Sequence, residues 1–428
     1  MLQIIKKLLD ILLLFLLFIS FCFAETKKIL NWKDCVEISM KNNPDLIIAQ
    51  KKLESAIYTY NLAWNSYYPS ADLRYGYSNT NLSTSSSRDW DFGVSASQTL
   101  FDKQKISDIK IKKFSLEQSE AEFKQTAALI RYNLKQAFLR IQYIQENIKL
   151  LKSIYDIRVQ TADIVRLQYD GGKESKGNML RANAQKNSAY IDITNAEKDL
   201  VVAKNFLLEC LGLDKHADFS INGTLTKVKP VKIHNLEEVM KTIPKILIAQ
   251  SSLKIAQNQL LYAKSSLFPT LKMNGSWNLA DKDAGLYSSA NEESWNFGIT
   301  ATYSVFGGGL TSTKNNIAIA KSTLEQSEEN LKKVQLNVKS ELQNLQTELE
   351  KNYNNVETIK LFLEAAIQRQ KEANIKYMAG RLDFQFWQDI EQELVNYELN
   401  NLSALYKLNL SLVEKENLLG IIFEEINK

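Results

Sequence analysis

The chain carries the same sequence unit twice, and this duplication limits the folds open to it more than any other feature. Four of its five prolines form two pairs, Pro44 with Pro69 and Pro244 with Pro269, spaced by 25 residues and offset by 200. Other landmarks return at slightly larger offsets: segments 90–93, 169–172 and 211–212 recur at 295–298, 377–380 and 419–420. Ordered recurrence of this kind predicts two copies of one structural unit.

The landmarks divide the 428 residues into a signal peptide 1–24, a first repeat 25–213, a connector 214–243, a second repeat 244–420 and a tail 421–428. Lys6 and Lys7 precede an apolar run at 11–23, which is too short for a permanent membrane helix and is typical of a secretory signal peptide. Phe21, a large residue just before Cys22, disfavours lipidation of that cysteine. We therefore expect an exported protein.

Stretches free of Gly and Pro predict unusually long helices, because these two residues are the strongest helix breakers. Such stretches are 45–68, 94–170, 178–211, 245–268, 310–379 and 381–419. Apolar residues recur at three- and four-residue steps at Ala127, Ile130, Leu134, Ala137, Ile141, Ile144, Ile148, Leu151 and Tyr155, and at every seventh residue at Ile317, Leu324, Leu331, Val338 and Leu345. A sustained seven-residue repeat predicts supercoiled helices. Since a helix of about 65 residues is about 100 Å long, we expect a rod.

Four shorter segments alternate apolar and polar residues with a period of two, the pattern of half-buried strands. They are 70–79 and 92–97 in the first repeat and 270–279 and 297–305 in the second, joined by polar loops at 79–89 and 280–294. Segments of about ten residues have the length of a membrane-spanning strand.

Two interpretations of these strands follow. Two hairpins could cap a soluble coiled coil, or the four strands could lie in a membrane. In lipid, each unpaired backbone group of an open sheet edge costs several kcal/mol, and bacterial single-chain barrels begin at about eight strands. If the strands span a membrane, several chains must therefore complete one barrel, and their polar faces line a wet lumen.

The composition argues against other classes of protein. The formal net charge is +4, from 53 basic and 49 acidic residues, which is too balanced to indicate a nucleic-acid partner. The chain has two histidines and three cysteines, so we expect no metal centre, no cofactor and no catalytic residue. The glycines at 307–309 lack the Lys-Ser/Thr of a phosphate-binding loop and predict a tight turn instead.

The remaining candidate ligands have simpler interpretations. His216 and His234 lie apart in the connector, which we expect to form a small patch against the helices. Cys35 and Cys210 could pair in an oxidising compartment, but Cys210 continues a packing seam, where a cysteine behaves as a small apolar residue. Asn31 and Asn235 each precede a short helix that they are expected to cap.

Taken in order, these motifs resemble those of the TolC-like outer-membrane channel proteins, the outer membrane factors of efflux and type I secretion systems. The shared features are NNPDL at 42–46, QTLFD at 98–102, YSVFGGG at 303–309 and the Tyr-x-x-Gly segments at 169–172 and 377–380. The resemblance covers residues 30–420 and implies an α+β membrane protein. In that family three chains pool four strands each into a twelve-stranded β-barrel, continued by a long α-helical coiled-coil periplasmic tunnel.

The resemblance also implies partners and a location. The family forms a homotrimer in the outer membrane, contacts outer-membrane lipid, and works with a periplasmic adaptor protein and a proton-driven or ATP-driven inner-membrane pump. We therefore expect a passive duct from periplasm to exterior. The alternative is a secreted periplasmic or surface coiled-coil scaffold or adhesin without channel activity. The sequence does not identify an exported substrate.

Gate residues follow only from the resemblance. In the family a tyrosine and an arginine after the second long helix hold the tunnel closed, and aspartates form a constriction. Leu382 stands at the arginine position and Phe386 at one of the two aspartate positions, so the family's gate is partly rewritten here. The candidate gate and constriction residues are Tyr377, Gly380, Arg381, Asp383, Asp389 and, on the facing turn, Gly177 and Asn178.

The same comparison gives a candidate docking surface for the adaptor. The exposed helix tips near 169–178 and 377–389 are the expected contact region, and Tyr169, Gly172 and Lys173 are its candidate residues.

Overall fold

The computed structural model describes residues 28–82, 85–214, 219–232, 235–281, 292–305 and 311–423. The predicted signal peptide, Cys22, both histidines and the glycines at 307–309 lie outside the described residues. The helices are α2 (Trp32–Asn42), α3 (Pro44–Trp64), α4 (Lys103–Asp170), α5 (Lys176–Leu211), α6 (Leu236–Met240), α7 (Pro244–Ser265), α8 (Ser312–Met378) and α9 (Phe384–Leu418), with a short 3₁₀ turn η1 (Asn65–Tyr67). The strands are β1 (Lys28–Leu30), β2 (Ser70–Leu82), β3 (Ser85–Phe101), β4 (Phe219–Ile221), β5 (Thr270–Asp281) and β6 (Glu292–Thr302).

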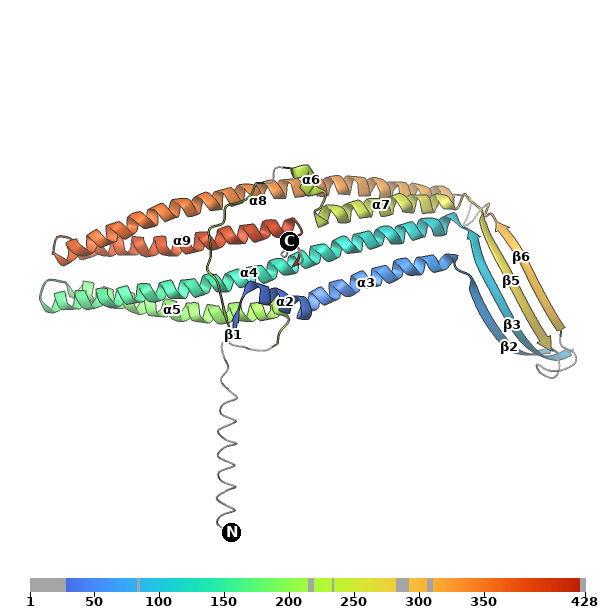
Figure 1. Ribbon diagram of the computed structural model, residues 1–428, viewed down its shortest axis with the longest axis horizontal. Helices are drawn as coiled ribbons and strands as arrows, with labels where there is room; N and C mark the ends of the chain where they lie inside the picture. The colour runs from blue at the N-terminus through green and yellow to red at the C-terminus, as the bar shows by residue number, and fades with distance from the viewer. Residues whose placement is uncertain are drawn as a thin grey trace, which may run out of the picture.

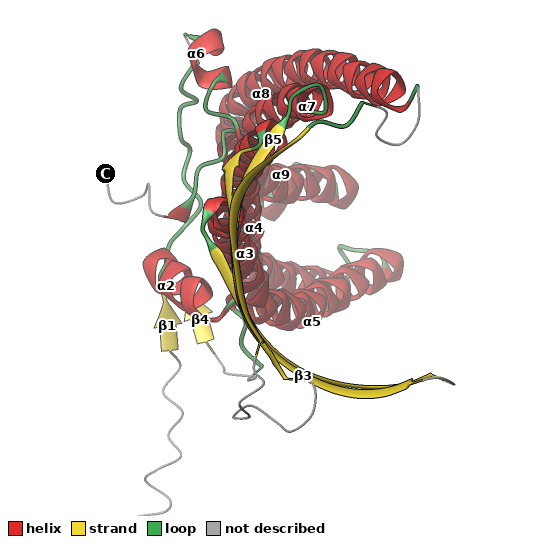
Figure 2. Ribbon diagram, turned by 90° about the vertical axis from the view of Figure 1, so that its right-hand side faces the viewer, coloured by secondary structure: helices red, strands yellow, loops and turns green. Residues whose placement is uncertain are grey.

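The helices form a long rod with the four-stranded sheet at one end (Figure 1). Helices α4 and α8 have 68 and 67 residues and run the whole length of the rod, which confirms the predicted long helices. The shorter α5 and α3 follow one another along α4, and α9 and α7 do the same along α8. Seen from the sheet end, the helices make a curved layer, and α2, β1, β4 and α6 lie on its outer side (Figure 2).

Side-chain caps fix where several helices begin. Asn31 and Asp34 form a capping box at α2, and Asn235 accepts a hydrogen bond from the Glu238 N–H at α6, as the sequence predicts. Asp102 caps the start of α4 by accepting from the N–H groups of Gln104 and Lys105. Pro44 and Pro244 occupy the first turns of α3 and α7, where a missing N–H costs nothing.

The duplicated landmarks at 211–212 and 419–420 end α5 and α9 in the same way. Gly212 and Gly420 adopt left-handed φ values of 70° and 73°, a conformation that glycine reaches without strain. Each glycine also lies in close contact with the chain near the start of the helix that continues along the rod. A Cβ on Gly212 would lie 2.3 Å from the Asn42 carbonyl oxygen, and one on Gly420 would lie 2.5 Å from the Pro244 ring. Gly212 lets α5 end directly against the junction of α2 and α3, and Gly420 lets α9 end directly against the start of α7.

The predicted apolar seam of α4 forms the main core. Its members are buried except for Tyr155, which is half-buried, so this prediction is confirmed. The seam of α8 is different. Only Val338 is buried among its five predicted members. Helix α8 lies at one edge of the curved layer, where α7 and α9 cover only part of its surface (Figure 2). Cys35 and Cys210 are both buried and free.

The four strands form one antiparallel sheet in the order β2-β3-β5-β6, so β3 and β5 join the two hairpins. The predicted loop at 79–89 is wrong, because β2 continues to Leu82 and β3 starts at Ser85. Backbone pairing extends through the Ser/Thr/Asn-rich sequence since it needs no apolar side chain. The predicted loop at 280–294 is also shortened at both ends, and β6 ends at Thr302 instead of continuing to 305.

The two faces of the sheet differ in polarity. Register places Leu73, Tyr75, Trp277 and Trp295 on one face, and the side chains of Leu73 and Trp295 are 77% and 76% exposed. The opposite face carries polar residues, including the Arg74–Asp91 ion pair at 2.7 Å. No described part of the chain covers the apolar face. An exposed apolar surface of this kind indicates a contact with lipid or protein.

The glycine at the end of α5 gives a test of the rod. We expect Gly212→Ala to lower stability more than Gly172→Ala, although both residues have φ near 70°. In Gly172→Ala only the left-handed backbone is strained, at a cost of about 1 kcal/mol, because no atom lies within 4 Å of the added Cβ. In Gly212→Ala the added Cβ also collides with the backbone of Asn42. Thermal unfolding followed by circular dichroism measures the difference, and equal losses would contradict the proposed junction.

Candidate functional site at the helical tips

The candidate site lies at the end of the rod farthest from the sheet, where the chain turns from α4 into α5 and from α8 into α9 (Figure 1). An apolar cluster joins all four helices there, and its buried members are Ala162, Val165, Ala182, Ala373, Tyr377, Phe384, Trp387 and Ile390. The two turns are therefore packed together rather than separate.

The Tyr-x-x-Gly landmark has the same structural role in both turns. The N–H of Gly172 donates to the Tyr169 carbonyl, and the N–H of Gly380 donates to the Tyr377 carbonyl, both at 2.9 Å. The next N–H in each turn reaches one residue further back, at 2.8 Å. This is the Schellman pattern that ends a helix with a left-handed glycine. The motif thus specifies the two chain reversals.

Tyr377 connects the two coiled coils. Its hydroxyl lies 2.7 Å from Gln168 Oε1 and 3.2 Å from Glu174 Oε1, so it donates to the α4–α5 turn. Its ring stacks on Trp387 with centroids 4.0 Å apart, and only 3% of the residue is exposed. Tyr169, the equivalent residue of the first repeat, is half-buried and makes no such contact with a described residue.

The surroundings of Tyr377 keep its hydroxyl protonated. Burial raises the pKa of Tyr377, and the nearby Glu174 carboxylate raises it further because a phenolate beside a carboxylate is unfavourable. The folded state therefore holds this proton more firmly than the unfolded chain. The stabilisation is complete below the usual tyrosine pKa of about 10 and is lost as the pH rises through the folded value.

Three other predicted gate residues make side-chain hydrogen bonds, and only that of Asn178 leads to Tyr377. Asn178 donates from Nδ2 to Glu174 Oε2 at 2.8 Å, so Glu174 links Asn178 to Tyr377. Asp383 caps α9 by accepting from the Phe386 N–H at 2.9 Å. Among the described residues, Asp389 accepts a hydrogen bond only from Gln385 of its own helix.

The remaining predicted residues make no side-chain contact across the coils with a described residue. Gly177, Arg381 and Lys173 are exposed, as is Gly172. Nothing in their geometry links them directly to Tyr377.

A buried polar network just behind the tips was not predicted. Arg158 of α4 and Glu391 of α9 are 5% and 2% exposed and form an ion pair at 3.2 Å. Thr161 Oγ1 donates to the same carboxylate at 3.4 Å. The sequence does contain a sign of this buried charge, because Arg158 stands at the next position of the apolar seam after Leu151 and Tyr155. A charge in a packing seam indicates a buried partner.

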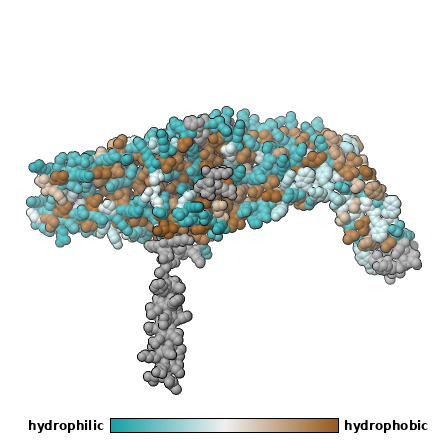
Figure 3. Space-filling model, viewed as in Figure 1, coloured by the Kyte–Doolittle hydropathy of each residue, from teal (hydrophilic) through white to brown (hydrophobic). Residues whose placement is uncertain are grey.

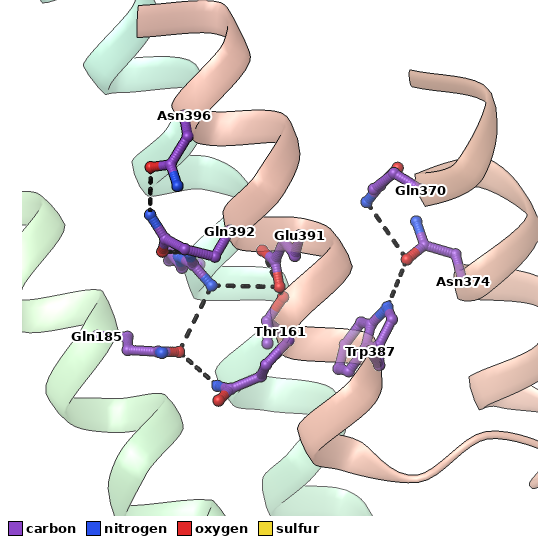
Figure 4. Close-up of polar contacts among 10 residues, drawn as sticks. Thr161, Gln185, Gln370, Asn374, Trp387, Glu391, Gln392 and Asn396 are labelled. Carbon is purple, nitrogen blue, oxygen red and sulfur yellow. Dashed lines mark hydrogen bonds and ion pairs between the residues drawn. The ribbon is translucent and has the colours of Figure 1, made fainter. Parts of the chain in front are cut away.

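Amides extend this network to a third helix (Figure 4). Arg158 donates to Gln185 of α5 at 3.4 Å and to Gln392 of α9 at 2.9 Å. Gln388 donates to the same Gln185 oxygen, and its own side-chain oxygen is buried with no hydrogen-bond partner in the described part of the chain. The network joins α9 to both helices of the first coil.

A second polar link holds α9 to α8. Trp387 Nε1 donates to Asn374 Oδ1 at 2.6 Å, and Gln370 donates to the same oxygen at 3.3 Å (Figure 4). The residue that stacks on Tyr377 is therefore itself held in place.

Burial raises the pKa of Glu391, and Arg158 and Thr161 offset this rise only in part. Since the pKa is raised above its unfolded value, the contribution of Glu391 to stability is greatest at acidic pH and falls as the pH rises through the folded pKa. Burial of this ion pair therefore does not add stability at neutral pH, and we expect its role to lie in the alignment of the coils.

The arrangement at the tips consists of contacts between helices. In the described part of the chain, no group of three His, Cys, Asp or Glu side chains could hold a metal ion. The described helices include none that is both long and apolar enough to cross a membrane. The polar groups at the tips contact one another across helices and link the two turns.

Comparison with known proteins agrees with this architecture. The model of the outer membrane efflux protein family matches residues 36–213 and 236–419. The probable outer membrane lipoprotein SilC of Salmonella typhimurium is 23% identical over 300 residues, which are 68% of this chain and 64% of SilC. The chain thus spans less than two thirds of the length of this relative.

Two solved structures share the fold. CusC, whose structures describe transmembrane channel formation, has a TM-score of 0.82 at 19% identity, covering 90% of this chain and 91% of CusC. The open state of the MtrE outer membrane channel of Neisseria gonorrhoeae has a TM-score of 0.81 at 19% identity, covering 90% of this chain and 88% of MtrE.

Tyr377→Phe tests the link between the coils, because it removes the hydroxyl and keeps the stacked ring. We expect a loss of about 1 kcal/mol in the local contact, seen as amide hydrogen exchange about fivefold faster in the α4–α5 turn. Tyr397→Phe is the matched control, since the Tyr397 ring stacks on Phe362 while its hydroxyl has no hydrogen-bond partner among the described residues. Unchanged exchange in Tyr377→Phe would exclude a role for the hydroxyl.

A double-mutant cycle tests the buried ion pair. Glu391→Leu leaves the Arg158 charge buried without its carboxylate, and we expect a loss of about 3 kcal/mol. Adding Arg158→Leu removes the stranded charge and should recover most of that loss. The single variant Arg158→Leu completes the cycle, and urea unfolding measures the two single variants and the double variant. Simple addition of the two single losses would show that the residues do not act as a pair.

Proposed function

The chain belongs to the outer membrane efflux protein family, and we propose on that basis that it is the outer-membrane channel of a tripartite efflux or type I secretion system. Three copies surround one passive duct from the periplasm to the exterior. Members of this family are channels rather than enzymes, so the work of transport comes from partner proteins.

The open edges of the sheet carry this proposal. Strands β2 and β6 are the outer strands of a sheet that has only four, and nothing in the described chain pairs with their outer edges. In lipid, unpaired backbone groups cost several kcal/mol each, so the edges must meet further strands. Three copies supply twelve strands, which suffices for a closed barrel.

The polarity of the sheet supports its orientation. The face with Leu73 and Trp295 lies against outer-membrane lipid, and the face with Arg74 and Asp91 lines the lumen. The helical rod then continues the lumen through the periplasm. The repeats 25–213 and 244–420 each supply one hairpin and one coil, and the connector 214–243 forms an outer patch at mid-rod.

The tips are the proposed periplasmic gate. Tyr377 and Asn178, through Glu174, hold the second coil against the first turn. Gly380 shapes the reversal, and Asp383 caps the helix that follows it. Asp389, Arg381 and Gly177 complete the candidate constriction, in which Phe386 replaces an aspartate of the family.

The same end of the rod is the proposed docking site for the adaptor. Lys173 and Gly172 are exposed at the first tip, and Tyr169 is half-buried beside them. A periplasmic adaptor bound there would couple the duct to a proton-driven or ATP-driven inner-membrane pump.

The sheet disfavours the alternative of a secreted scaffold or adhesin. Phe297 is 66% exposed on the same face as Trp295, so a soluble monomer would present a large apolar surface to water. A membrane covers this surface.

Fractionation and conductance test the channel. We expect the full chain in outer-membrane extracts as heat-sensitive trimers that form pores in planar lipid bilayers. A soluble periplasmic monomer that forms no pores would refute the channel and favour the scaffold.

Charge reversal tests the docking site. We expect the Lys173→Glu/Lys176→Glu variant, which changes two exposed lysines of the first tip, to form conducting trimers but to lose export in cells by at least about tenfold, because a repulsive charge disfavours the bound complex. Lys333→Glu, an exposed change in the middle of α8, is the control. Full export by the double variant would place the adaptor elsewhere.

A further inference from the structure

A groove of about 760 Å³ lies where the helical rod meets the sheet. Tyr60 and Trp64 of α3 line one side, and Ile106 and Lys110 of α4 line the other, with Leu100 of β3 at the sheet end. Trp64, Leu100 and Ile106 all expose apolar surface. The space-filling view shows apolar and polar surface mixed around this junction (Figure 3).

Hydrogen bonds make the groove rigid. The Tyr67 hydroxyl donates to the Asp102 carbonyl at 2.8 Å, which ties the end of α3 to the start of α4. Lys105 Nζ donates to the Ser66 carbonyl at 2.8 Å and to Thr99 Oγ1 at 2.7 Å. The groove therefore exists before any ligand binds.

Two lysines give the groove a positive end. Lys110 and Lys113 both line it, are exposed, and have no hydrogen-bond or ion-pair partner among the residues that the structure describes. At a spacing of three residues they lie on one face of α4, with Cβ atoms about 6 Å apart. The Cα–Cβ bonds of a helix tilt toward its N-terminus, which for α4 is the sheet end, so both lysine side chains leave the helix in the direction of the sheet.

This combination matches a phospholipid. Its phosphate fits between two neighbouring ammonium groups, and its acyl chains fit the apolar wall and the exposed apolar face of the sheet above. Trp and Tyr prefer the boundary between headgroups and hydrocarbon, and lysine stems reach along apolar surface to a charged headgroup.

We infer that this groove is a binding site for an anionic phospholipid of the inner leaflet of the outer membrane, with the phosphate held by Lys110 and Lys113 and an acyl chain beside Trp64. The inference rests on the proposed function, because the membrane position of the sheet places lipid at this height. The bound lipid fills the junction between barrel and tunnel.

Native mass spectrometry with added phosphatidylglycerol tests the site, on trimers first shown to conduct. Near a membrane surface each lysine contributes about fivefold to binding, so Lys110→Gln/Lys113→Gln should bind phosphatidylglycerol about 30-fold more weakly. Lys332→Gln/Lys333→Gln makes the same change of charge on α8 and should bind like the unaltered protein. Equal binding by both double variants would overturn the inference.

Fluorescence gives a second measurement that leaves the lysines unaltered. Brominated phosphatidylglycerol should quench the tryptophan emission of the full chain, and Trp64→Phe should remove a distinct part of that quenching. Conducting trimers that bind no phosphatidylglycerol, including trimers in which a second copy covers the groove, would overturn this inference alone. A chain that forms neither trimers nor pores would instead refute the proposed channel.

Discussion

Strands β2 and β6 each leave one edge without backbone hydrogen bonds to the rest of the described chain. These unpaired edges limit the environments and the assemblies in which the sheet is stable. Two hairpins give a sheet of four strands, and an open sheet of this size has two edges. Water could satisfy those edges, but the same sheet exposes Leu73, Trp295 and Phe297 on one face. In the proposed channel, lipid covers the apolar face, but lipid cannot satisfy the unpaired backbone groups of the two edge strands. Strands from other copies of the chain must therefore pair with these edges and close the barrel. In the proposed channel, assembly of several copies is thus a condition of the fold.

The length of the rod is the second constraint on this chain. Helices of 68 and 67 residues separate the sheet from the tips, so both ends are set by the length of α4 and α8. Glycines at two kinds of position make this possible. Gly172 and Gly380 reverse the chain at the tips, while Gly212 and Gly420 let α5 and α9 end directly against the residues just before α3 and at the start of α7. The duplicated sequence therefore builds a long curved layer from short and long helices together.

Polar groups inside the coils contribute specificity rather than stability. An all-apolar seam permits helices to slide by a turn, whereas Arg158 and Glu391 pair in only one alignment. Tyr377 adds a hydroxyl contact at the tip beyond this pair. The tip is held by a few directional contacts over a small apolar cluster, and the proposed gate requires a region that opens locally.

Much of this architecture could be predicted from the sequence. Spacing of apolar residues and of Gly and Pro is local information, and it correctly predicted the duplication, the long helices, the seam of α4, the caps at Asn31 and Asn235 and four alternating strands. It failed at 79–89, because polar residues that look like a loop can still pair through their backbones. The resemblance to a family selected Tyr377, but it did not give Gln168 and Glu174 as its partners.

Only the tertiary structure decided which distant segments meet. Tyr377 and Gln168 are 209 residues apart, and Arg158 and Glu391 come from different repeats, so no local pattern links them. The pairing of β3 with β5 and the partial exposure of α8 were likewise fixed by how the two copies lie beside each other. The sequence by itself determined the elements, since these depend on neighbours in the chain. The folded chain decided the site and the open edges, since these depend on neighbours in space.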